Sequence, residues 1–417
     1  MFRICFPAIY LFAAVGTLLS VTQAAAKQIL LSPDSNWFEV LAGDAVDPGD
    51  QIVLAAGTYS DRRLLTISLR GTADAPIIIR AATGQQVVFK RPDARQNSIN
   101  LVGCQFLVLR GIEITGGDSG IRISGSDDHP AKFITLEDLH IHHINGVAVT
   151  ANAAGQIYES LTFRRNHIHH TGGHGEGFYL GSNNTADGRI NGYIFNSVIE
   201  NNYIHDLRGS NVSQGDGIEL KDGCYGNFVR DNVIHSTGYP GIIVYSSGGK
   251  AANIIERNVI WDSADHGIQA ASDAVVRNNI IYDVKGFGIY SRNHQNANVG
   301  RLQLVHNTII NDRAIRIIAP QQFSGPVVVA NNAVSGEQRI PQAAEIISRS
   351  NTTAIIGFFP QAGSKCIGSA DPQFVPQDDF NGTPRGDTRD TGAYRYAPTG
   401  NPGWTVAAEF KKAIPSR

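Results

Sequence analysis

The residues with the types and spacing best suited to chemistry lie between positions 214 and 245. Lys221 closely follows Asp216 and Glu219, and Tyr245 comes in the next glycine-led segment. A lysine amine can remove a proton, a tyrosine hydroxyl can supply one, and a nearby carboxylate can assist both groups. We therefore predict Lys221, Tyr245 and Glu219 as catalytic residues, with Lys221 exposed on the protein surface.

The acidic residues beside Lys221 also suit a cation. Asp216 and Glu219 favour the charged form of the lysine, which opposes its use as a base. They fit better as oxygen ligands of a hard cation such as Ca²⁺. Aromatic and charged side chains around them would contact sugar rings and carboxylates. The predicted substrate-binding residues are His174, Tyr179, His266, Tyr290 and Arg292.

A repeat that runs through most of the chain after residue 100 must position these side chains. One repeated element is a glycine followed by a short apolar run; the other is asparagine, any residue, then an aliphatic residue. The absence of helical segments of about ten residues between them excludes a βαβ fold. A repeat that cannot bury its apolar side alone must stack on its neighbours. The sequence therefore predicts an all-β fold, a single right-handed parallel β-helix.

The repeats also predict which side chains stack in register. Because side chains alternate along a strand, the residue after each repeat glycine should point inward and the next one outward. The predicted inward line is Ile121, Val147, Phe178, Ile218, Ile242, Ile268 and Ile289. The first predicted outward column is Arg122, Ala148, Tyr179, Glu219, Ile243, Gln269 and Tyr290. The second is Ser124, Thr150, Gly181, Lys221, Tyr245, Ala271 and Arg292.

The repeat asparagines should form a ladder of their own. Each side-chain amide would bond to its neighbours in adjacent coils, which satisfies polar groups buried in a turn. The predicted members are Asn166, Asn202, Asn232, Asn258, Asn279 and Asn307.

The two ends of the chain differ from the repeats. Residues 1–26 combine a basic start, an apolar stretch and a small-residue cleavage site, which predicts a signal peptide and a secreted or periplasmic protein. An amphipathic segment at 35–41 predicts a helical cap over the first coil. We expect the catalytic β-helix domain to span residues 27–331. The last coils and a loop-rich cap should span residues 332–417.

Composition excludes several other classes. The 35 basic and 37 acidic residues give a net charge of −2, which offers no electrostatic basis for binding nucleic acid. The apolar run at the start of the chain is too short for a membrane span. Cys104, Cys224 and Cys366 form neither a disulfide framework nor a zinc spacing, and we expect them to be buried. We expect a monomer.

The predicted outward face suits an extended acidic polysaccharide. Extra residues at 181–192 and 207–214 should form loops that wall this face. β-Elimination in a uronic-acid polymer needs a neutralised carboxylate, a base for the adjacent carbon and an acid for the leaving oxygen. With Lys221 as the base and Tyr245 as the acid, the sequence predicts a polysaccharide lyase.

Two stretches carry a resemblance to a known family. The runs at 49–59 and 71–81 resemble the opening coils of secreted right-handed β-helix proteins, including polysaccharide lyases. The spacing of Asp216 before Lys221 resembles that of a calcium-binding glutamate before the base in the chondroitinase-B-like lyases, which include alginate lyases. The resemblance implies Glu176 as a further calcium ligand, with Asp216 and Glu219. The chain departs from the family at Gln214, where a second calcium-binding glutamate would stand, and it lacks the family's Arg-His-Gly stretch.

A second column of rings occupies the third position after the repeat asparagines. Its members are His142, His169, His205, His235, Trp261 and Tyr282, with His140, His143, His167 and His170 nearby. Neutral imidazoles are good metal ligands, but no zinc-like set with a carboxylate stands out. A structural ladder of stacked rings is the favoured interpretation, and metal binding is the alternative. His174 and His266 are better placed for function because they flank the Lys221 face.

Other functions fit the same scaffold. A C5-epimerase or a glycoside hydrolase is the first alternative, since a hydrolase needs paired carboxylates and Asp216 and Glu219 lie close together. A non-catalytic glycan-binding surface protein is the second, because a fold alone does not specify a reaction.

Overall fold

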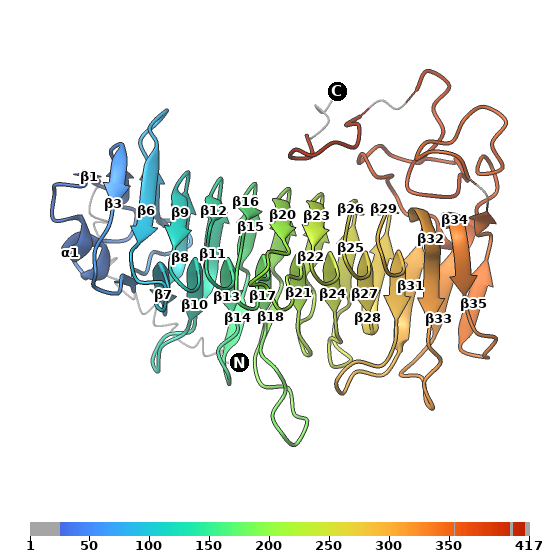
Figure 1. The fold of residues 1–417 in the computed structure, drawn as a ribbon, viewed down its shortest axis with the longest axis horizontal. Helices are drawn as coiled ribbons and strands as arrows, with labels where there is room; N and C mark the ends of the chain where they lie inside the picture. Colours follow the sequence, from blue (N-terminus) through green and yellow to red (C-terminus); the bar gives the residue numbers. More distant parts are fainter. Residues whose placement is uncertain (1–25, 354, 401–402, 413–417) are drawn as a thin grey trace, which may run out of the picture.

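Short strands succeed one another along the chain, and each pairs in parallel with strands one coil before and after it (Figure 1). The structure is a computed structural model that describes residues 26–353, 355–400 and 403–412. Within these residues the strands form one sheet of 15 strands and one of 21. The predicted parallel β-helix is therefore confirmed. The predicted signal peptide, apart from its last residue, lies outside the described residues.

The 15-stranded sheet forms the first face of the solenoid. Its strands are β1 (Gln28–Leu31), β2 (Gln51–Leu54), β5 (Ile77–Ala81), β8 (Gln105–Arg110), β11 (Lys132–Glu137), β14 (Ile157–Glu159), β15 (Thr162–Arg164), β18 (Tyr193–Phe195), β19 (Val198–Glu200), β22 (Phe228–Arg230), β25 (Asn253–Glu256), β28 (Ser272–Arg277), β31 (Gly300–Val305), β33 (Val327–Ala330) and β35 (Ile346–Arg349).

The 21-stranded sheet covers two faces, because β32 (Thr308–Ile317) pairs at its start with one row of strands and at its end with another. One row is called the histidine face here: β3 (Gly57–Tyr59), β6 (Val87–Arg91), β9 (Glu113–Gly116), β12 (His140–His142), β16 (His167–His169), β20 (Tyr203–Leu207), β23 (Val233–Thr237), β26 (Val259–Trp261), β29 (Ile280–Tyr282), β34 (Ala333–Arg339) and β36 (Thr352–Thr353).

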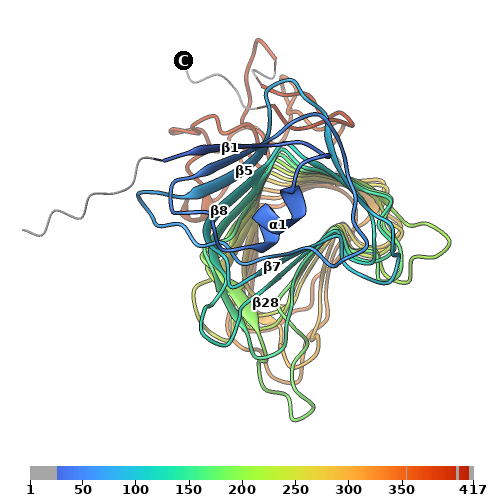
Figure 2. The ribbon, with the colours of Figure 1, turned by 90° about the vertical axis from the view of Figure 1, so that its left-hand side faces the viewer.

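The other row is called the groove face: β4 (Thr66–Ile67), β7 (Ile99–Val102), β10 (Ile121–Ser124), β13 (Val149–Ala151), β17 (Phe178–Leu180), β21 (Ile218–Leu220), β24 (Ile242–Val244), β27 (Ile268–Ala270) and β30 (Ile289–Ser291). All three rows turn their aliphatic side chains into one continuous core. The helix α1 (Trp37–Ala42) closes the open end of the first coil, as predicted (Figure 2).

The repeat glycines stand where adjacent coils come too close for a side chain. A Cβ on Gly217 would lie 2.4 Å from the carbonyl oxygen of Gly241, and one on Gly177 would lie 2.6 Å from that of Gly217. At these two positions a side chain would push the coils apart, because such contacts are shorter than van der Waals separation. The repeated glycines therefore follow from the close approach of the stacked coils.

The predicted register holds from Phe178 onward and is wrong one coil earlier. Ile218, Ile242, Ile268 and Ile289 follow Phe178 in the inward line, but the residue before it is Val149, not Val147. The reason is that Ala148, rather than Gly146, occupies the corner that glycine fills in the later coils. Thr150 consequently stands beside Tyr179, where the sequence had predicted Ala148.

The asparagine ladder is confirmed at every predicted position. Each side-chain amide donates to the Oδ1 of the next asparagine and to a backbone carbonyl one coil back; for Asn202 these hydrogen bonds measure 2.9 and 3.0 Å. The ladder extends beyond the prediction to Asn332 and Asn351. The residue before each predicted ladder asparagine has a left-handed backbone, with φ between 53° and 58° at Arg165, Asn201, Asp231, Arg257, Asn278 and His306.

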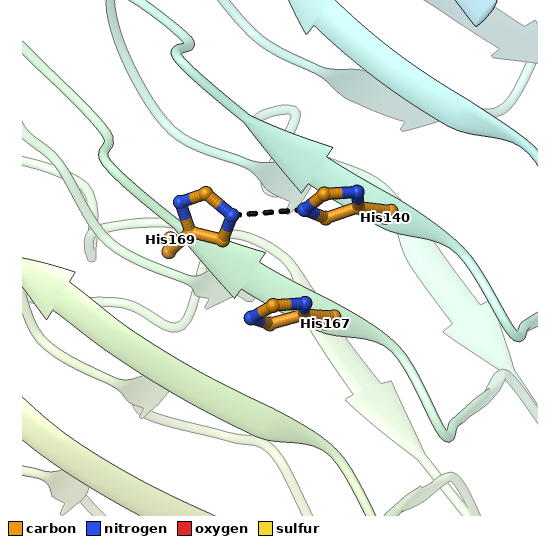
Figure 3. Close-up of side chains that lie close together, drawn as sticks. All are labelled: His140, His167 and His169. Carbon is orange, nitrogen blue, oxygen red and sulfur yellow. Dashed lines mark hydrogen bonds between the residues drawn. The ribbon is translucent and has the colours of Figure 1, made fainter. Parts of the chain in front are cut away.

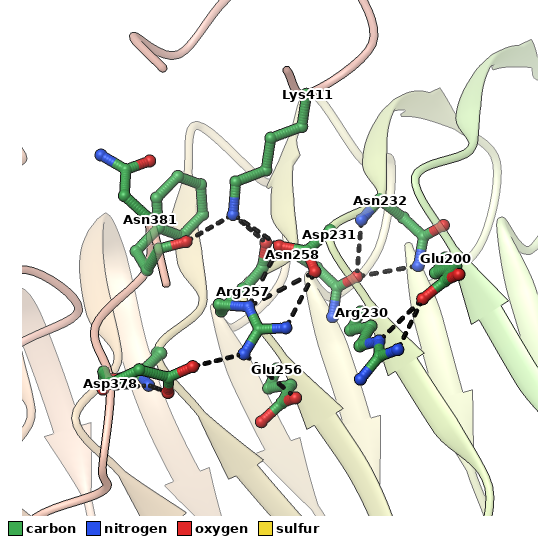
Figure 4. A network of polar contacts seen from close by, with 12 residues as sticks. Glu200, Arg230, Asp231, Asn232, Glu256, Arg257, Asn258, Asp378, Asn381 and Lys411 are labelled. Atoms are coloured by element: carbon green, nitrogen blue, oxygen red, sulfur yellow. Dashed lines mark hydrogen bonds and ion pairs between the residues drawn. The ribbon is translucent and has the colours of Figure 1, made fainter. Parts of the chain in front are cut away.

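After β36 the chain runs back over the outside of the histidine face (Figure 1), with one 3₁₀ turn, η1 (Pro372–Phe374). Phe380, Tyr394 and Trp404 pack on Val233, Val259 and Ile280. Figure 4 shows the buried end of this segment, where the Nζ of Lys411 lies 2.8 Å from Asp231. Asp231 also pairs with Arg257, which in turn reaches Asp378 at 2.7 Å.

Two further predictions concern cysteines and membranes. Cys104, Cys224 and Cys366 are all buried, as expected, and each is a free thiol. None of the helices that the structure describes is long and apolar enough to cross a membrane.

Candidate active site

Strands β17, β21 and β24 bring Lys221 and Tyr245 together on the groove face. Lys221 follows β21 directly and Tyr245 follows β24. The predicted stacking therefore places the two residues at equivalent positions in adjacent coils. The Nζ of Lys221 lies 3.1 Å from the hydroxyl of Tyr245 and 2.7 Å from Oε1 of Glu219. The Tyr245 hydroxyl donates to the same Oε1 at 2.8 Å. The three predicted catalytic residues therefore form one closed set of contacts.

Lys221 is not exposed, which corrects the sequence-based expectation. Only 5% of its surface is accessible, and the amine lies 4.8 Å from the ring centroids of both Tyr179 and Tyr245. The rings of the neighbouring coils cover its aliphatic stem, and the sequence pattern alone could not show how tightly they close. The amine still points away from the solenoid core, because it borders a cleft.

This cleft has a volume of about 340 Å³ and is called the groove cleft. Its walls come from the strands of the groove face and from the loops that follow β17 and β30. It is lined by His174, Tyr179, Asn183, Gln214, Asp216, Glu219, Lys221, Tyr239, Pro240, Ile243, Tyr245, Asp265, Gln269, Arg292, His294 and Gln295. A larger cleft of about 520 Å³, next to Lys285 and Phe358, contains none of the predicted site residues.

Three buried carboxylates lie together at the groove cleft, and two of them, Asp216 and Glu219, belong to its lining. One oxygen from each of Glu176, Asp216 and Glu219 lies within 4.8 Å of the others. Among the described residues, both oxygens of Glu176, Oδ1 of Asp216 and Oε2 of Glu219 have no hydrogen-bond partner. Unpaired buried carboxylate oxygens are costly, and hard oxygen ligands suit Ca²⁺. The predicted set thus fits a divalent cation.

The protonation of these groups reflects burial and mutual repulsion. Burial and the Glu219 charge raise the pKa of Glu176 to about 7. Burial and the charges of Glu219 and Glu176 raise the pKa of Asp216 well above its ordinary value. Burial and Glu219 also raise the pKa of Tyr245, so its hydroxyl keeps its proton at neutral pH.

Not every predicted substrate-binding residue reaches the groove cleft. His174, Tyr179 and Arg292 line it, whereas His266 and Tyr290 do not belong to its lining. Their rings contact each other instead, with centroids 4.1 Å apart, and the backbone N–H of Phe287 donates to Nδ1 of His266. Tyr290 lies one strand beyond Gln269, which is the last strand residue in the lining, and His266 stands just before the strand that carries Gln269.

His294 is the main site residue that the sequence did not reveal. Its ring meets the ring of Tyr245 edge-on, with centroids 4.5 Å apart, and its Nδ1 lies 3.4 Å from Gln269. Burial, with Arg292 and Lys221 nearby, lowers the pKa of His294 to about 4. The loop that carries His294 also touches the loop after β17, through Gln295 and Asn183. No repeat covers this loop, so only its position between β30 and β31 could have pointed to it.

A comparison with protein-family models now places the fold. The model described as right handed beta helix region matches residues 88–253 and 248–334, more than half of the chain. The chain belongs to the right-handed β-helix family. This β-helix protein also matches the Chondroitinase B model over residues 39–126, which cover its opening coils and end before the groove cleft. No curated protein matches the chain in a sequence search.

Several solved structures share the fold of this β-helix protein. An alginate lyase from Paenibacillus sp. str. FPU-7 is 19% identical, with a TM-score of 0.53 over 72% of this chain and 99% of that one. Pectate lyase Pel9A is 14% identical, with a TM-score of 0.57 over 89% and 96%. A mannuronic acid specific family 6 lyase from human gut microbiota is 17% identical, with a TM-score of 0.55 over 77% and 83%. These likenesses confirm the right-handed parallel β-helix.

Proposed function

We propose that this protein is a secreted or periplasmic polysaccharide lyase that cleaves a uronic-acid-containing polysaccharide by β-elimination in the groove cleft. The contact between the Lys221 amine and the Tyr245 hydroxyl, 3.1 Å apart at the cleft wall, carries the proposal. β-Elimination needs a base for the C5 proton and an acid for the leaving oxygen, and this pair supplies both. The structural neighbours include an alginate lyase and a pectate lyase, which supports an acidic polymer as the substrate.

In this mechanism Lys221 removes the C5 proton of a uronate unit. The C4–O bond to the departing chain breaks, a C4=C5 double bond forms, and Tyr245 gives its proton to the leaving oxygen. Tyr245 is suited to this role because its raised pKa keeps the phenol protonated. Afterwards the Lys221 ammonium can return a proton to the tyrosinate directly, since the two atoms are within hydrogen-bond distance. Both groups are then reset without a further residue.

Glu219 imposes a condition on this mechanism. Its carboxylate lies 2.7 Å from the Lys221 amine and favours the ammonium, which cannot accept a proton. Glu176, Asp216 and Glu219 would hold Ca²⁺ through their unpaired oxygens. A bound cation would supply positive charge that offsets Glu219 and would attract a substrate carboxylate.

The rest of the groove cleft suits a sugar acid. Arg292 can bind a carboxylate through paired hydrogen bonds. Tyr179 exposes part of an aromatic ring beside Lys221, which suits packing against a sugar ring. His174 lies 3.6 Å from Glu176 at the edge of the cleft and is exposed, so it can meet the polymer as it enters.

Hydrolysis is the second candidate, favoured by one observation. The raised pKa of Glu176 and of Asp216 is typical of a carboxylic acid that donates a proton to a leaving sugar. Glu176, however, does not line the groove cleft and has 0% of its surface accessible, so it cannot reach a glycosidic oxygen there. Asp216 lines the cleft, but Glu219 beside it is held by the Lys221 amine at 2.7 Å. Lys221 and Tyr245 both line the cleft in contact with each other, so elimination is preferred.

The test is an incubation with alginate, pectate and chondroitin sulfate in the presence of Ca²⁺. The lyase makes an unsaturated uronate, seen as new ultraviolet absorbance, and Lys221→Ala abolishes it. Reducing ends without absorbance would instead show hydrolysis. A change of uronate configuration without cleavage would show an epimerase, and retention without a reaction would show a binding protein. Full lyase activity in Lys221→Ala would contradict the assignment of the base.

A further inference from the structure

The histidine face holds a second cluster of potential ligands, away from the groove cleft. Eight of the 13 histidines of the chain fall in a few adjacent coils of this face or its corner. Strand pairing aligns two columns there, one containing His140 and His167 and the other containing His142, His169, His205 and His235. His143 and His170 form a third stack at the turn beyond, with ring centroids 4.9 Å apart.

Stacking alone does not account for imidazoles at these positions. The column of His169 continues with Trp261 and Tyr282, whose rings stack in the same way with centroids 5.5 Å apart. Rings without a second nitrogen thus fulfil the packing requirement further along the ladder. The difference between the two stretches is that the histidines place several nitrogen atoms close together.

The nitrogens of three rings converge across two strands. Nε2 of His140 lies 2.8 Å from Nε2 of His169, and Figure 3 shows these two atoms facing each other with His167 alongside. One ligand nitrogen from each of the three lies within 4.8 Å of the others. In a tetrahedral zinc site the nitrogens stand about 3.3 Å apart, given Zn–N bonds of about 2.0–2.1 Å. The 2.8 Å between His140 and His169 is near that spacing, while Nε2 of His167 lies 2.8 Å from Nε2 of His205.

Neighbouring groups contact the other nitrogens of the cluster. Nδ1 of His169 lies 2.6 Å from His170, which leaves its Nε2 directed at His140. Nε2 of His142 lies 3.2 Å from a carboxylate oxygen of Glu113 on the preceding coil. The repeat pattern does not mark a carboxylate in this column, but the structure brings Glu113 into a second triad with His140 and His142. Such outer contacts fix ring orientation in metal sites.

The cluster is also open to solvent ions. His140, His167 and His169 are half-buried rather than closed off. The C-terminal segment covers the apolar part of the same face over Val233, Val259 and Ile280. Its Phe410 reaches the border of the cluster, where it meets the edge of His167 with centroids 6.2 Å apart.

We propose that His140, His167 and His169 bind one divalent transition-metal ion of the zinc type on the histidine face. Three imidazoles with a position open to water are a common zinc ligand set, and nitrogen ligands select this class of metal over Ca²⁺. The site is separate from the carboxylate set at the groove cleft, whose oxygen ligands suit a hard cation.

The test measures Zn²⁺ binding by calorimetry to tag-free, chelator-treated protein with Ca²⁺ in excess to occupy the carboxylate set. We expect one Zn²⁺ per chain. His140→Phe and His169→Phe keep a stacked ring but lose the nitrogens, and each should weaken binding by about tenfold or more. His235→Phe, in the same column but outside the triad, is the matched control and should bind as the wild type does.

A second measurement needs no variant. Cu²⁺ added to the wild type should give an electron paramagnetic resonance spectrum with splitting from several nitrogen ligands. Unchanged melting temperatures in the phenylalanine variants would show that lost binding is not lost folding. The proposal is overturned if the wild type binds no Zn²⁺, if His140→Phe and His169→Phe bind it unchanged, or if the Cu²⁺ spectrum shows oxygen ligands alone.

Discussion

The amine of Lys221 lies 3.1 Å from the hydroxyl of Tyr245, although the two residues belong to successive coils 24 positions apart. Tyr245→Phe removes the proposed acid and keeps the ring beside Lys221. We expect kcat on the uronate polymer to fall by about 10²- to 10⁴-fold with little change in KM, measured by ultraviolet absorbance. Tyr225→Phe, outside the lining of the groove cleft and stacked on Phe195 of β18, should keep full activity. An unchanged kcat in Tyr245→Phe would remove this residue from the mechanism.

The unpaired oxygens of Glu176, Asp216 and Glu219 predict that Ca²⁺ stabilises the fold. Adding Ca²⁺ to chelator-treated protein should raise the melting temperature, because a ligand at 100 times its Kd contributes about 2.7 kcal/mol. Glu176→Gln should lose most of this rise. Glu200→Gln, which only disturbs a pair with Arg230, should retain it. Identical melting curves with and without Ca²⁺ would argue against the cation.

Lys411 is predicted to anchor the C-terminal segment. Its amine is buried and bonds to Asp231 and to the carbonyl oxygens of Arg257 and Phe380. Lys411→Met leaves these partners without a donor and should lower the free energy of unfolding by roughly 3 kcal/mol. The adjacent Lys412 is exposed and forms an ion pair with Glu409, so Lys412→Met should change the free energy of unfolding by less than about 0.5 kcal/mol. Chemical denaturation compares the two variants, and equal effects would refute the anchor.

Asp231 predicts a pH dependence for the same anchor. Burial opposes its ionisation, but Lys411 and Arg257 outweigh burial and hold the pKa of Asp231 below 3.8. Its charge therefore stabilises the fold above the unfolded pKa, and this contribution disappears as pH falls through the lower folded value. The stability gap between wild type and Asp231→Asn should be large at pH 7 and shrink below pH 3.8. A gap that stays constant in denaturation curves across this range would contradict the prediction.

Much of the architecture could be predicted because the contacts that form it repeat. A glycine was needed wherever adjacent coils left no room for a Cβ, and an asparagine wherever a buried turn needed a donor and an acceptor in line. These requirements recur once per coil, so their spacing gives the register. The prediction failed at Ala148, because alanine met the corner requirement and left no glycine to mark it.

The candidate site was less predictable because half of it comes from outside the repeats. Lys221, Glu219 and Tyr245 could be aligned because each sits at a fixed place after a repeat glycine. His294 lies in a loop that follows no pattern, and it reaches Tyr245 only through the way that the loop folds back. The burial of Lys221 depends on two tyrosine rings from neighbouring coils, a three-dimensional closure that strand alternation does not describe.

The C-terminal segment runs along the solenoid, across the strands, and contacts several coils. Gly392 bonds to Asn331 near the end of the column, while Lys411 holds Asp231 four ladder steps earlier. Coils that contact only their neighbours could otherwise unfold one after another from the end of the solenoid. Because the C-terminal segment is bound at both of these contacts, we expect the coils between them to unfold together as one cooperative unit.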